Sequence, residues 1–512
     1  MIKSFLKSQK VDGYPLLITI IFLLTSIVVP SHVIFFILST IYFTLLVYLT
    51  NSILKTIFYC FFPFWILDVG RTFSYLAVPA SAIFNPIYPN GRSIFFTLSP
   101  YFVIALVTII ILYTLIIKDL LKRIDKKNPS VRNSSITIFK NRYLVYFLIT
   151  FLLFFLSSTL TNFFPSLSLL YTTEEYAFLA WTLISIILLR NLPNKEITKT
   201  LTTFFLILFA LLVVESGITY AQFIKRGVLG LAVEKQTSIP TFGFGVDEDT
   251  TSFRPIGLSY HANSLANWQV TLLTSLILIW MFIKNSFSKK ISNFLIAISV
   301  GLSTTIIVLT ISRSAYISLA VFIFILVAFN RTKTVQLVQL VLRQLNKFKI
   351  ILLPILIFFI YLVTDRAYYS LFSLTTSGGL ATRANQIPDA ISIIEKSPFI
   401  GIGNGMYIPA TYSLDPFGPV KYFPEQVHDG FLLLLAERGI LVPIPYILGL
   451  ALLTKHLKKS RFSRTFKIIA TASIVATYVM MLFQPFINLF SLNILILCIL
   501  LDVKINEKSK NR

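Results

Sequence analysis

The sequence predicts an all-helical protein that crosses a membrane many times. Hydrophobic residues make up 56% of the 512 residues, charged residues only 13%, and the mean hydropathy is +0.80. A soluble protein of this length would carry about 25% charged residues. Because a run of roughly 20 apolar residues crosses the bilayer once, we expect one polytopic membrane domain over residues 1–512, with about 12–14 transmembrane helices.

The apolar runs follow one another along the whole chain. The first run has no small-residue cleavage site and is followed at once by a second, so we expect it to anchor the protein. Residues 70–91 are the least regular part, where a segment that re-enters the membrane is an alternative to a loop. The predicted spans are 14–29, 32–49, 53–69, 94–117, 143–160, 176–189, 201–220, 264–283, 291–311, 315–329, 350–363, 440–454, 468–482 and 486–501.

The distribution of basic residues predicts the topology. With the N-terminus in the cytoplasm, every Lys- and Arg-rich segment falls on the cytoplasmic side, as the positive-inside rule requires. Both termini are then cytoplasmic. The formal net charge of +24 follows from topology and from attraction to anionic inner-leaflet lipids, so nucleic acid is not an expected partner. The basic segments begin at Met1, Lys118, Arg190, Lys284, Arg331, Lys455 and Lys504.

Two outer loops are unusually long, at residues 221–263 and 364–430. Loops of this length inside a compact protein are usually functional, and we expect the second to carry part of the site. The two cysteines, Cys60 and Cys498, both fall inside apolar runs and are expected to be packing residues.

Four short segments carry most of the unusual residues, and the topology puts all of them at the outer face. A glycine-rich GIGNG begins at Gly401 but follows no predicted strand and lies outside the cell, which argues against a nucleotide loop. The four segments are FRPIGLSYHANSLANW from Phe253, TISRSAY from Thr310, ATRANQIPDAISIIEKSPFIGIGNGMY from Ala381 and VHDGFLLLLAERG from Val427.

Three arginines in these segments are candidates for binding an anion. Arg313 lies in a tight turn between two apolar helices, where it either reaches lipid headgroups without specificity or grips an anionic headgroup with its guanidinium fork. Arg254 precedes a Pro and Gly turn signal, and a salt bridge to the acidic residues 247–249 is its alternative role. Arg383 opens a stretch of helical apolar spacing, where a solvated helix face is the alternative.

His428, one of only four histidines, is the candidate general base. An interfacial histidine is the alternative interpretation. Positive neighbours favour neutral imidazole, and with a reference pKa of about 6.5 the side chain is then a free base at neutral pH. Such a base contributes about 10²–10⁴-fold to a reaction when it reaches an acceptor hydroxyl. The adjacent Asp429 either orients the imidazole or caps the helix that begins at Phe431, and we favour the cap.

Other polar residues of these segments could line the site. For His261, packing and lining of the site are equally favoured roles. Asn263 is a possible lining residue. Glu437 is expected to pair with Arg438 or with a loop residue. Glu174 and Glu175 lie at the outer end of a span, where solvation is the favoured interpretation.

No metal or other cofactor is expected. No two histidines have the spacing of metal ligands, and no Ser-His-Asp arrangement is legible. The acidic run at residues 247–249 is the one place in an outer loop where a cation could bind.

Taken together, the four segments resemble the O-antigen ligase and O-antigen polymerase superfamily of bacterial membrane glycosyltransferases, over residues 253–442. FRPIGLSYHANSLA is similar to the family's Arg-x-x-Gly … Pro-Asn segment, with Ala262 where proline is usual. TISRSAY is similar to its Ser-Arg turn, and SPFIGIGNGMY to its Pro-x-x-Gly-x-Gly segment. VHDGFLLLLAERGI is similar to its His-Asn … Glu-x-Gly segment, but Asp429 replaces the asparagine, so a role for an amide there does not carry over.

The resemblance implies a GT-C-like helical fold in the cytoplasmic membrane of a bacterium, with an extracytoplasmic loop over the site. It implies a glycan on undecaprenyl diphosphate as the donor and a glycan or lipid as the acceptor. His428 would correspond to the base and Arg313 and Arg383 to the diphosphate-binding arginines, with Arg254 as a further candidate. A flippase and a chain-length regulator would be partners. The implied reaction is an inverting, metal-independent transfer to an acceptor hydroxyl.

Three functions remain open at this point. A polymerase adds the glycan to another lipid-linked glycan, whereas a ligase adds it to lipid A-core, to a protein or to another surface acceptor. The long outer loops favour the polymerase, because they could accommodate two glycan chains. A lipid-linked oligosaccharide flippase or other transporter would carry ionisable groups and broken helices near the midplane, in repeats. Here the ionisable residues cluster at the outer ends of spans, which favours an enzyme.

Overall fold

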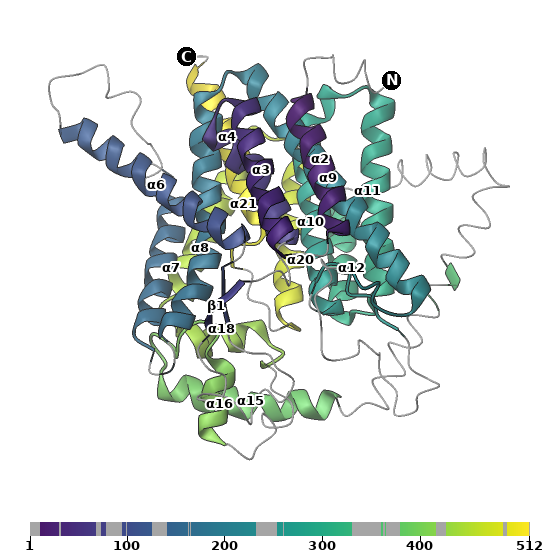
Figure 1. Ribbon diagram of the computed structural model, residues 1–512. Helices are drawn as coiled ribbons and strands as arrows, with labels where there is room; N and C mark the ends of the chain where they lie inside the picture. The colour runs from purple at the N-terminus through teal and green to yellow at the C-terminus, as the bar shows by residue number, and fades with distance from the viewer. Residues whose placement is uncertain are drawn as a thin grey trace.

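The computed structural model is a bundle of long helices that run roughly along one common direction (Figure 1). In the residues it describes, the only strands are β1 (Phe73–Ala77) and β2 (Phe95–Leu98), an antiparallel pair. The predicted all-helical membrane fold is confirmed, with this pair as a small addition. The structure describes residues 11–29, 32–67, 73–77, 95–98, 100–124, 141–161, 163, 165–231, 253–259, 261–329, 360–361, 364, 379–415, 426–484 and 489–510.

Seven of the described helices are long and apolar enough to cross a membrane, and three shorter apolar helices stand beside them. In chain order the helices are α2 (Gly13–Val28), α3 (His32–Thr50), α4 (Ile53–Leu67), α6 (Pro100–Ile124), α7 (Arg142–Thr159), α8 (Pro165–Asn191), α9 (Asn194–Lys225), α10 (Ala262–Ile283), η4 (Lys284–Ser286), α11 (Lys289–Leu309), α12 (Arg313–Phe329), α15 (Gly379–Lys396), α16 (Tyr407–Leu414), α18 (Gly430–Arg438), α19 (Pro443–Lys459), α20 (Arg464–Met481) and α21 (Leu492–Lys510).

Every predicted span except 350–363 corresponds to one of these helices; most of that span, like most of residues 70–91, lies outside the described residues. The largest difference in a boundary is at α8, which begins at Pro165 rather than at residue 176. Hydropathy does not detect the first turns of α8 because they contain polar residues. The hydroxyl of Thr173 in these turns donates a hydrogen bond to the carbonyl of Leu169 at 2.7 Å. A threonine that bonds back into its own helix in this way tolerates an apolar environment.

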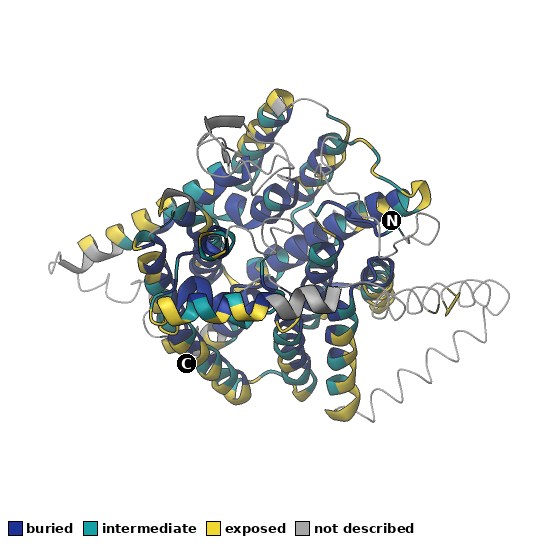
Figure 2. Ribbon diagram, turned by 90° about the horizontal axis from the view of Figure 1, so that it is seen from below, coloured by how far each residue is buried: buried dark blue, intermediate teal, exposed yellow. Residues whose placement is uncertain are grey.

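Helices α8 and α10 form the centre of the bundle, with 78% of each spanning segment buried, whereas only 22% of the α3 segment is buried. Figure 2 shows this arrangement, with buried residues facing inward and exposed ones at the periphery. An aromatic cluster fills the centre, where Trp181 stacks on Phe58 at 5.6 Å and packs edge-on against Phe62 at 4.9 Å. The outer helices keep apolar side chains on their exposed faces, as helices that contact lipid must.

The two ends of the bundle differ in character. Both termini lie at one end, which we call the terminal end, whereas α15, α16 and α18 gather at the opposite end, which we call the site end (Figure 1). Ion pairs join helices at the terminal end: Asp12 contacts Lys55 at 2.7 Å and Lys199 at 2.8 Å, and Arg190 pairs with Asp502. Residues near the beginning and the end of the described chain are therefore tied into the same end of the bundle.

Candidate functional site

Helix α18 organises the site end, and Asp429 begins it. The carboxylate Oδ1 of Asp429 accepts hydrogen bonds from the backbone N–H groups of Phe431 at 2.8 Å and Leu432 at 3.0 Å. These are N–H groups that have no partner within the helix. The predicted helix cap is confirmed, and it accounts for an aspartate beside His428 without a catalytic role.

The glycine-rich segment at residues 401–405 caps the other end of α18. Ile402 donates its N–H to the carbonyl of Ala436 at 3.1 Å, and Gly403 donates to that of Glu437 at 2.8 Å. Gly401 has a φ of +69°, and a Cβ there would lie less than 3.0 Å from backbone atoms of α18. Glycine is needed because only a residue without a side chain can adopt this backbone so close to the helix end. The glycines are therefore explained by packing, without a nucleotide.

His428 lies just before α18 and contacts α15. Its Nδ1 lies 3.1 Å from the side-chain oxygen Oε1 of Gln386, which is itself buried. Because an amide oxygen can only accept a hydrogen bond, this contact favours the tautomer with the proton on Nδ1. In the neutral form of that tautomer the other ring nitrogen, Nε2, keeps the lone pair, which is the state that a general base requires.

Arg254 is buried and supports the turn between α11 and α12. Its Nε donates to the carbonyl of Thr310 at 2.6 Å, and its Nη2 donates to Oδ1 of Asn263 at 2.6 Å. His261 accepts from the N–H of Asn263 at 3.1 Å and so caps α10 from an exposed position. The alternative role of Arg254, a salt bridge to residues 247–249, lies outside the described residues.

Arg313 is the first residue of α12 and follows this same turn. Ile311 in the turn has a φ of +53°, a left-handed backbone that costs a β-branched residue energy and persists only where neighbours hold it. Arg254 supplies one such contact through Thr310. The structure therefore brings two of the predicted arginines to the two sides of one strained turn.

The Arg313 turn and the His428 segment meet at the end of α20. Gln484, just after α20, donates from its side-chain nitrogen to the hydroxyl of Ser314 at 2.8 Å. A Cβ on Gly430 would lie 2.9 Å from the carbonyl oxygen of the same Gln484. Arg313 adjoins Ser314 and His428 is two residues from Gly430, so both predicted site segments converge on one residue. Arg383 lies on α15, one turn before Gln386; its side chain lies outside the described part.

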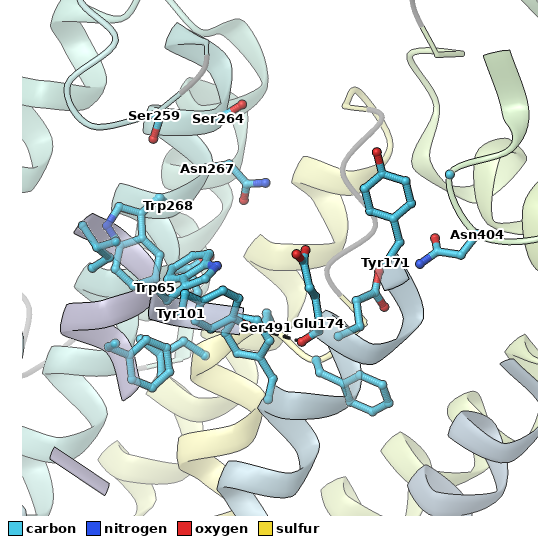
Figure 3. A pocket seen from close by; sticks show the side chains of 18 of the residues that line it. Trp65, Tyr101, Tyr171, Glu174, Ser259, Ser264, Asn267, Trp268, Asn404 and Ser491 are labelled. Carbon is cyan, nitrogen blue, oxygen red and sulfur yellow. Dashed lines mark hydrogen bonds between the residues drawn. The ribbon is translucent and has the colours of Figure 1, made fainter. Parts of the chain in front are cut away.

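A cavity of about 540 Å³ lies beside α18, among α4, α8, α9 and α10. Figure 3 shows Trp65, Tyr101 and Trp268 on one side of it, Tyr171 and Asn404 on the other, and Glu174 directed into the space between them. The sequence did not indicate this cavity, because its lining comes from segments far apart in the chain.

Arg438, at the end of α18, lines this cavity and forms a buried ion pair. Its Nη2 donates to Glu175 at 2.7 Å and to the side-chain oxygen of Asn404 at 3.1 Å, and the guanidinium lies 3.8 Å above the ring of Phe154. The expectation that Glu175 is solvated was wrong. Its partner approaches from a helix that is remote in sequence, and the Glu175 side chain remains 27% exposed.

Glu437 is buried beside this ion pair. Its carboxylate accepts from the backbone N–H of Tyr407, the first residue of α16, at 3.2 Å. This partner belongs to a helix, whereas the sequence led us to expect Arg438 or a loop residue as the partner of Glu437. Burial raises the pKa of Glu437 to about 7, although Arg438 acts in the opposite direction. Glu437 therefore titrates near neutral pH, unlike an exposed glutamate.

Sequence reasoning missed Glu215, a further carboxylate that lines the cavity from α9. Its Oε2 accepts from the indole N–H of Trp268 at 2.9 Å and from the amide of Gln269 at 2.8 Å. A carboxylate inside the apolar run VVESGI is itself a signal, because intramembrane ionisable residues are rare and usually have a dedicated partner.

Comparison with known proteins bears on the segments described above. Residues 298–447 match a family model described as O-Antigen ligase. The matched region begins in α11 and ends in α19, so it includes Arg313, Arg383, His428 and Glu437, whereas Arg254 precedes it. No curated protein matches the chain.

Proposed function

We propose that this protein polymerises glycan repeat units at the outer face of a bacterial cytoplasmic membrane. The match of residues 298–447 to a family model described as O-Antigen ligase supports a transfer of lipid-linked glycans. The donor is a glycan on undecaprenyl diphosphate, and the acceptor is a hydroxyl of a second lipid-linked glycan. The observation that carries the proposal is the convergence of the Arg313 turn and the His428 segment on Gln484.

The arginines bind the donor diphosphate. Arg313 stands at the N-terminus of α12, where the helix dipole adds partial positive charge instead of offsetting that of the guanidinium. Such a position favours an anionic ligand. Arg254 holds the turn through its hydrogen bonds to Thr310 and Asn263, and Arg383 on α15 is the third arginine of the set. Together they stabilise the negative charge that develops on the leaving diphosphate, which makes a metal unnecessary.

His428 acts as the base. Its Nε2 takes the proton from the acceptor hydroxyl, and the hydroxyl oxygen attacks the anomeric carbon of the donor sugar. The bond from that carbon to the diphosphate oxygen breaks, and lipid diphosphate leaves with the electron pair. Attack opposite to the leaving group inverts the configuration. Gln386 keeps the reactive tautomer in place through Nδ1.

We favour polymerisation over ligation because of the length of the two predicted outer loops, 221–263 and 364–430. The test is transfer by the purified full-length protein in lipid nanodiscs, supplied with undecaprenyl-diphosphate oligosaccharide, with products separated by length. A ladder of products is expected. Single transfer, and only to a lipid A-core acceptor, would replace the polymerase with a ligase.

The role of His428 is tested in the same assay. His428→Ala is expected to lower the rate by about 10²–10⁴-fold. His456→Ala is the matched control, because His456 lies near the end of α19 among lysines, next to Tyr143 at the terminal end. Unchanged transfer by His428→Ala would refute the mechanism, and the absence of transfer by wild-type protein to any acceptor would refute the function.

A further inference from the structure

The cavity beside α18 has the opposite charge to the arginine site. Among the described residues that line it, the ionisable carboxylic acids are Glu174, Glu175, Glu215 and Glu437, and Arg438 is the cation. Arg254 and Arg313 are not part of this lining. A diphosphate would therefore be repelled here, and the cavity suits a different part of the substrate.

One wall of the cavity is an aromatic platform. The rings of Trp65 and Trp268 lie 4.8 Å apart with an interplanar angle of 72°, and Trp65 also packs edge-on against Phe178 at 5.3 Å. These contacts hold the indoles in fixed orientations. The electron-rich face of an indole attracts the weakly positive C–H groups on the apolar face of a sugar ring.

Arg438 has unused hydrogen-bonding capacity in this cavity. The residue is 1% exposed, and its Nε and Nη1 atoms are buried without a hydrogen-bond partner, although Nη2 is paired with Glu175 and Asn404. A buried donor left unpaired is costly, and such atoms call for an explanation. A ligand oxygen that accepts a hydrogen bond would satisfy them.

A sugar hydroxyl matches both requirements at once. It donates to ionised carboxylates, which can only accept, and it accepts from the guanidinium, which can only donate. An amino group on the sugar would also donate to the carboxylates and gain from their charge. A carboxylate or phosphate on the sugar would face like charges from Glu174 and Glu215.

We propose that this cavity binds the terminal sugar ring of the acceptor, and that it selects rings with hydroxyl or amino groups over rings that carry an acid. The identity of the ligand as a glycan rests on the proposed function. The assignment to the acceptor follows from position, because Gln426, two residues before His428, lines the cavity, as does Leu433 of the helix that His428 precedes. A ring bound here lies beside the segment that carries His428.

The test is binding of a matched pair of oligosaccharides to the full-length protein in nanodiscs, without donor lipid. One is released by mild acid from the surface polysaccharide of the source; the other is the same oligosaccharide with its primary hydroxyls oxidised to carboxylates. Binding is followed by tryptophan fluorescence and by saturation-transfer NMR of the sugar. We expect the oxidised form to bind at least about tenfold more weakly, about 1.4 kcal/mol, and Glu174→Gln to narrow that difference.

Two tryptophan variants test the platform. Trp65→Ala is expected to weaken the affinity for the oligosaccharide at least about tenfold. Trp280→Ala is the control and should leave this affinity unchanged. The indole N–H of Trp280 donates to Ser292, away from the cavity. Should Trp65→Ala fail to fold, Glu174→Gln still tests the charge of the cavity through the difference in affinity between the two oligosaccharides. Equal affinity for the two oligosaccharides, or equal binding by both tryptophan variants, would overturn the proposal. Binding without any transfer would refute only the proposed function, and transfer with an unchanged acceptor KM in Trp65→Ala would refute only the cavity.

Discussion

Arg438 donates a hydrogen bond to Glu175 at 2.7 Å, although 263 residues separate the two in the sequence. The pair joins the end of α18 to the spanning helix α8, and the guanidinium also covers the ring of Phe154 on α7. The helix that follows His428 is thereby attached to two spanning helices. This attachment positions the His428 segment relative to the cavity.

Replacing one member of this pair is expected to lower the stability of the protein more than replacing both members. Arg438→Met leaves Glu175, whose side chain is 27% exposed, without its cation, and we expect a loss of stability of about 1–3 kcal/mol. The double variant Glu175→Gln, Arg438→Met should recover a large part of that loss, because no uncompensated charge remains. Thermal unfolding in detergent measures both. Arg226→Met, at an exposed arginine, is the control and should change stability by less than about 0.5 kcal/mol. A double variant no more stable than Arg438→Met contradicts the interpretation.

The glycine-rich cap of α18 leads to a second prediction. Gly401→Ala places a Cβ against the backbone of α18 at a φ of +69°, so the loop or the helix must move. We expect a loss of at least about 2 kcal/mol of stability and reduced transfer activity. Gly301→Ala is the matched control, since nothing lies within 4 Å of a Cβ there and the position is helical. That change should be neutral or stabilise by about 0.5–1 kcal/mol. Equal stability of the two variants would show that the close approach is unimportant.

These contacts mark the limit of what the sequence can predict. The helices were predictable because hydropathy is a local property of each apolar run. The helix cap at Asp429 was predictable because its hydrogen bonds reach only the next three residues. The start of α8 was not predictable from the sequence. Its threonines count as polar in hydropathy, although a hydroxyl there donates a hydrogen bond to the backbone of its own helix. The convergence of Arg254, Arg313 and His428 at one end was expected from topology alone.

The cavity could not be predicted in the same way. Glu175 looks like a solvated residue at a span end until Arg438 is brought beside it by the fold. To predict the hydrogen bond between Trp268 and Glu215, one must know that α9 and α10 are adjacent and how each helix is rotated about its axis. Local patterns predict where polar residues lie along a helix, but which partner removes them from water depends on tertiary packing.

Arg254 provides a third prediction, on activity. Arg254→Lys cannot hold the carbonyl of Thr310 and the amide of Asn263 in the same fork, because lysine presents a single nitrogen. The strained turn before Arg313 then loses a support. We expect kcat/KM for the lipid-linked donor to fall about tenfold or more, a loss of about 1.4 kcal/mol. Arg226→Lys at the same end of the bundle is the control. Full activity of Arg254→Lys would exclude a positioning role.

Glu437 predicts a pH dependence of stability. Burial raises its folded-state pKa to about 7 from a value of 4.5, so the folded state binds a proton more tightly than the unfolded state. The stabilisation is fully present below pH 4.5 and is lost as the pH rises toward 7, by up to about 3 kcal/mol. Glu437→Gln should remove this part of the pH dependence. The stability of the variant relative to wild type should therefore increase between pH 5 and pH 8. Glu395→Gln, at an exposed residue, should leave the wild-type profile unchanged. Parallel profiles for wild type and Glu437→Gln would contradict the assignment.

The last prediction concerns the hydrogen bond between Gln386 and His428. Gln386→Leu removes the acceptor for Nδ1, so the imidazole can place its proton on Nε2 and lose the reactive lone pair. We expect a lower kcat with little change in the donor KM, because the arginines are untouched. Gln386→Glu instead sets a carboxylate beside the ring, which stabilises the protonated imidazolium. The acidic limb of the pH–rate profile should then move to higher pH.

The two variants together separate catalysis from folding. A purely structural role for Gln386 would lower activity in both without moving the pH profile, since burial of Leu or Glu would disturb α15 at any pH. A basic role for His428 requires the profile of Gln386→Glu to move upward while its activity at the new optimum stays above that of Gln386→Leu. Transfer assays from pH 5 to pH 9, on protein shown by thermal unfolding to be folded, distinguish the two roles. A profile that stays in place in Gln386→Glu would remove His428 as the base.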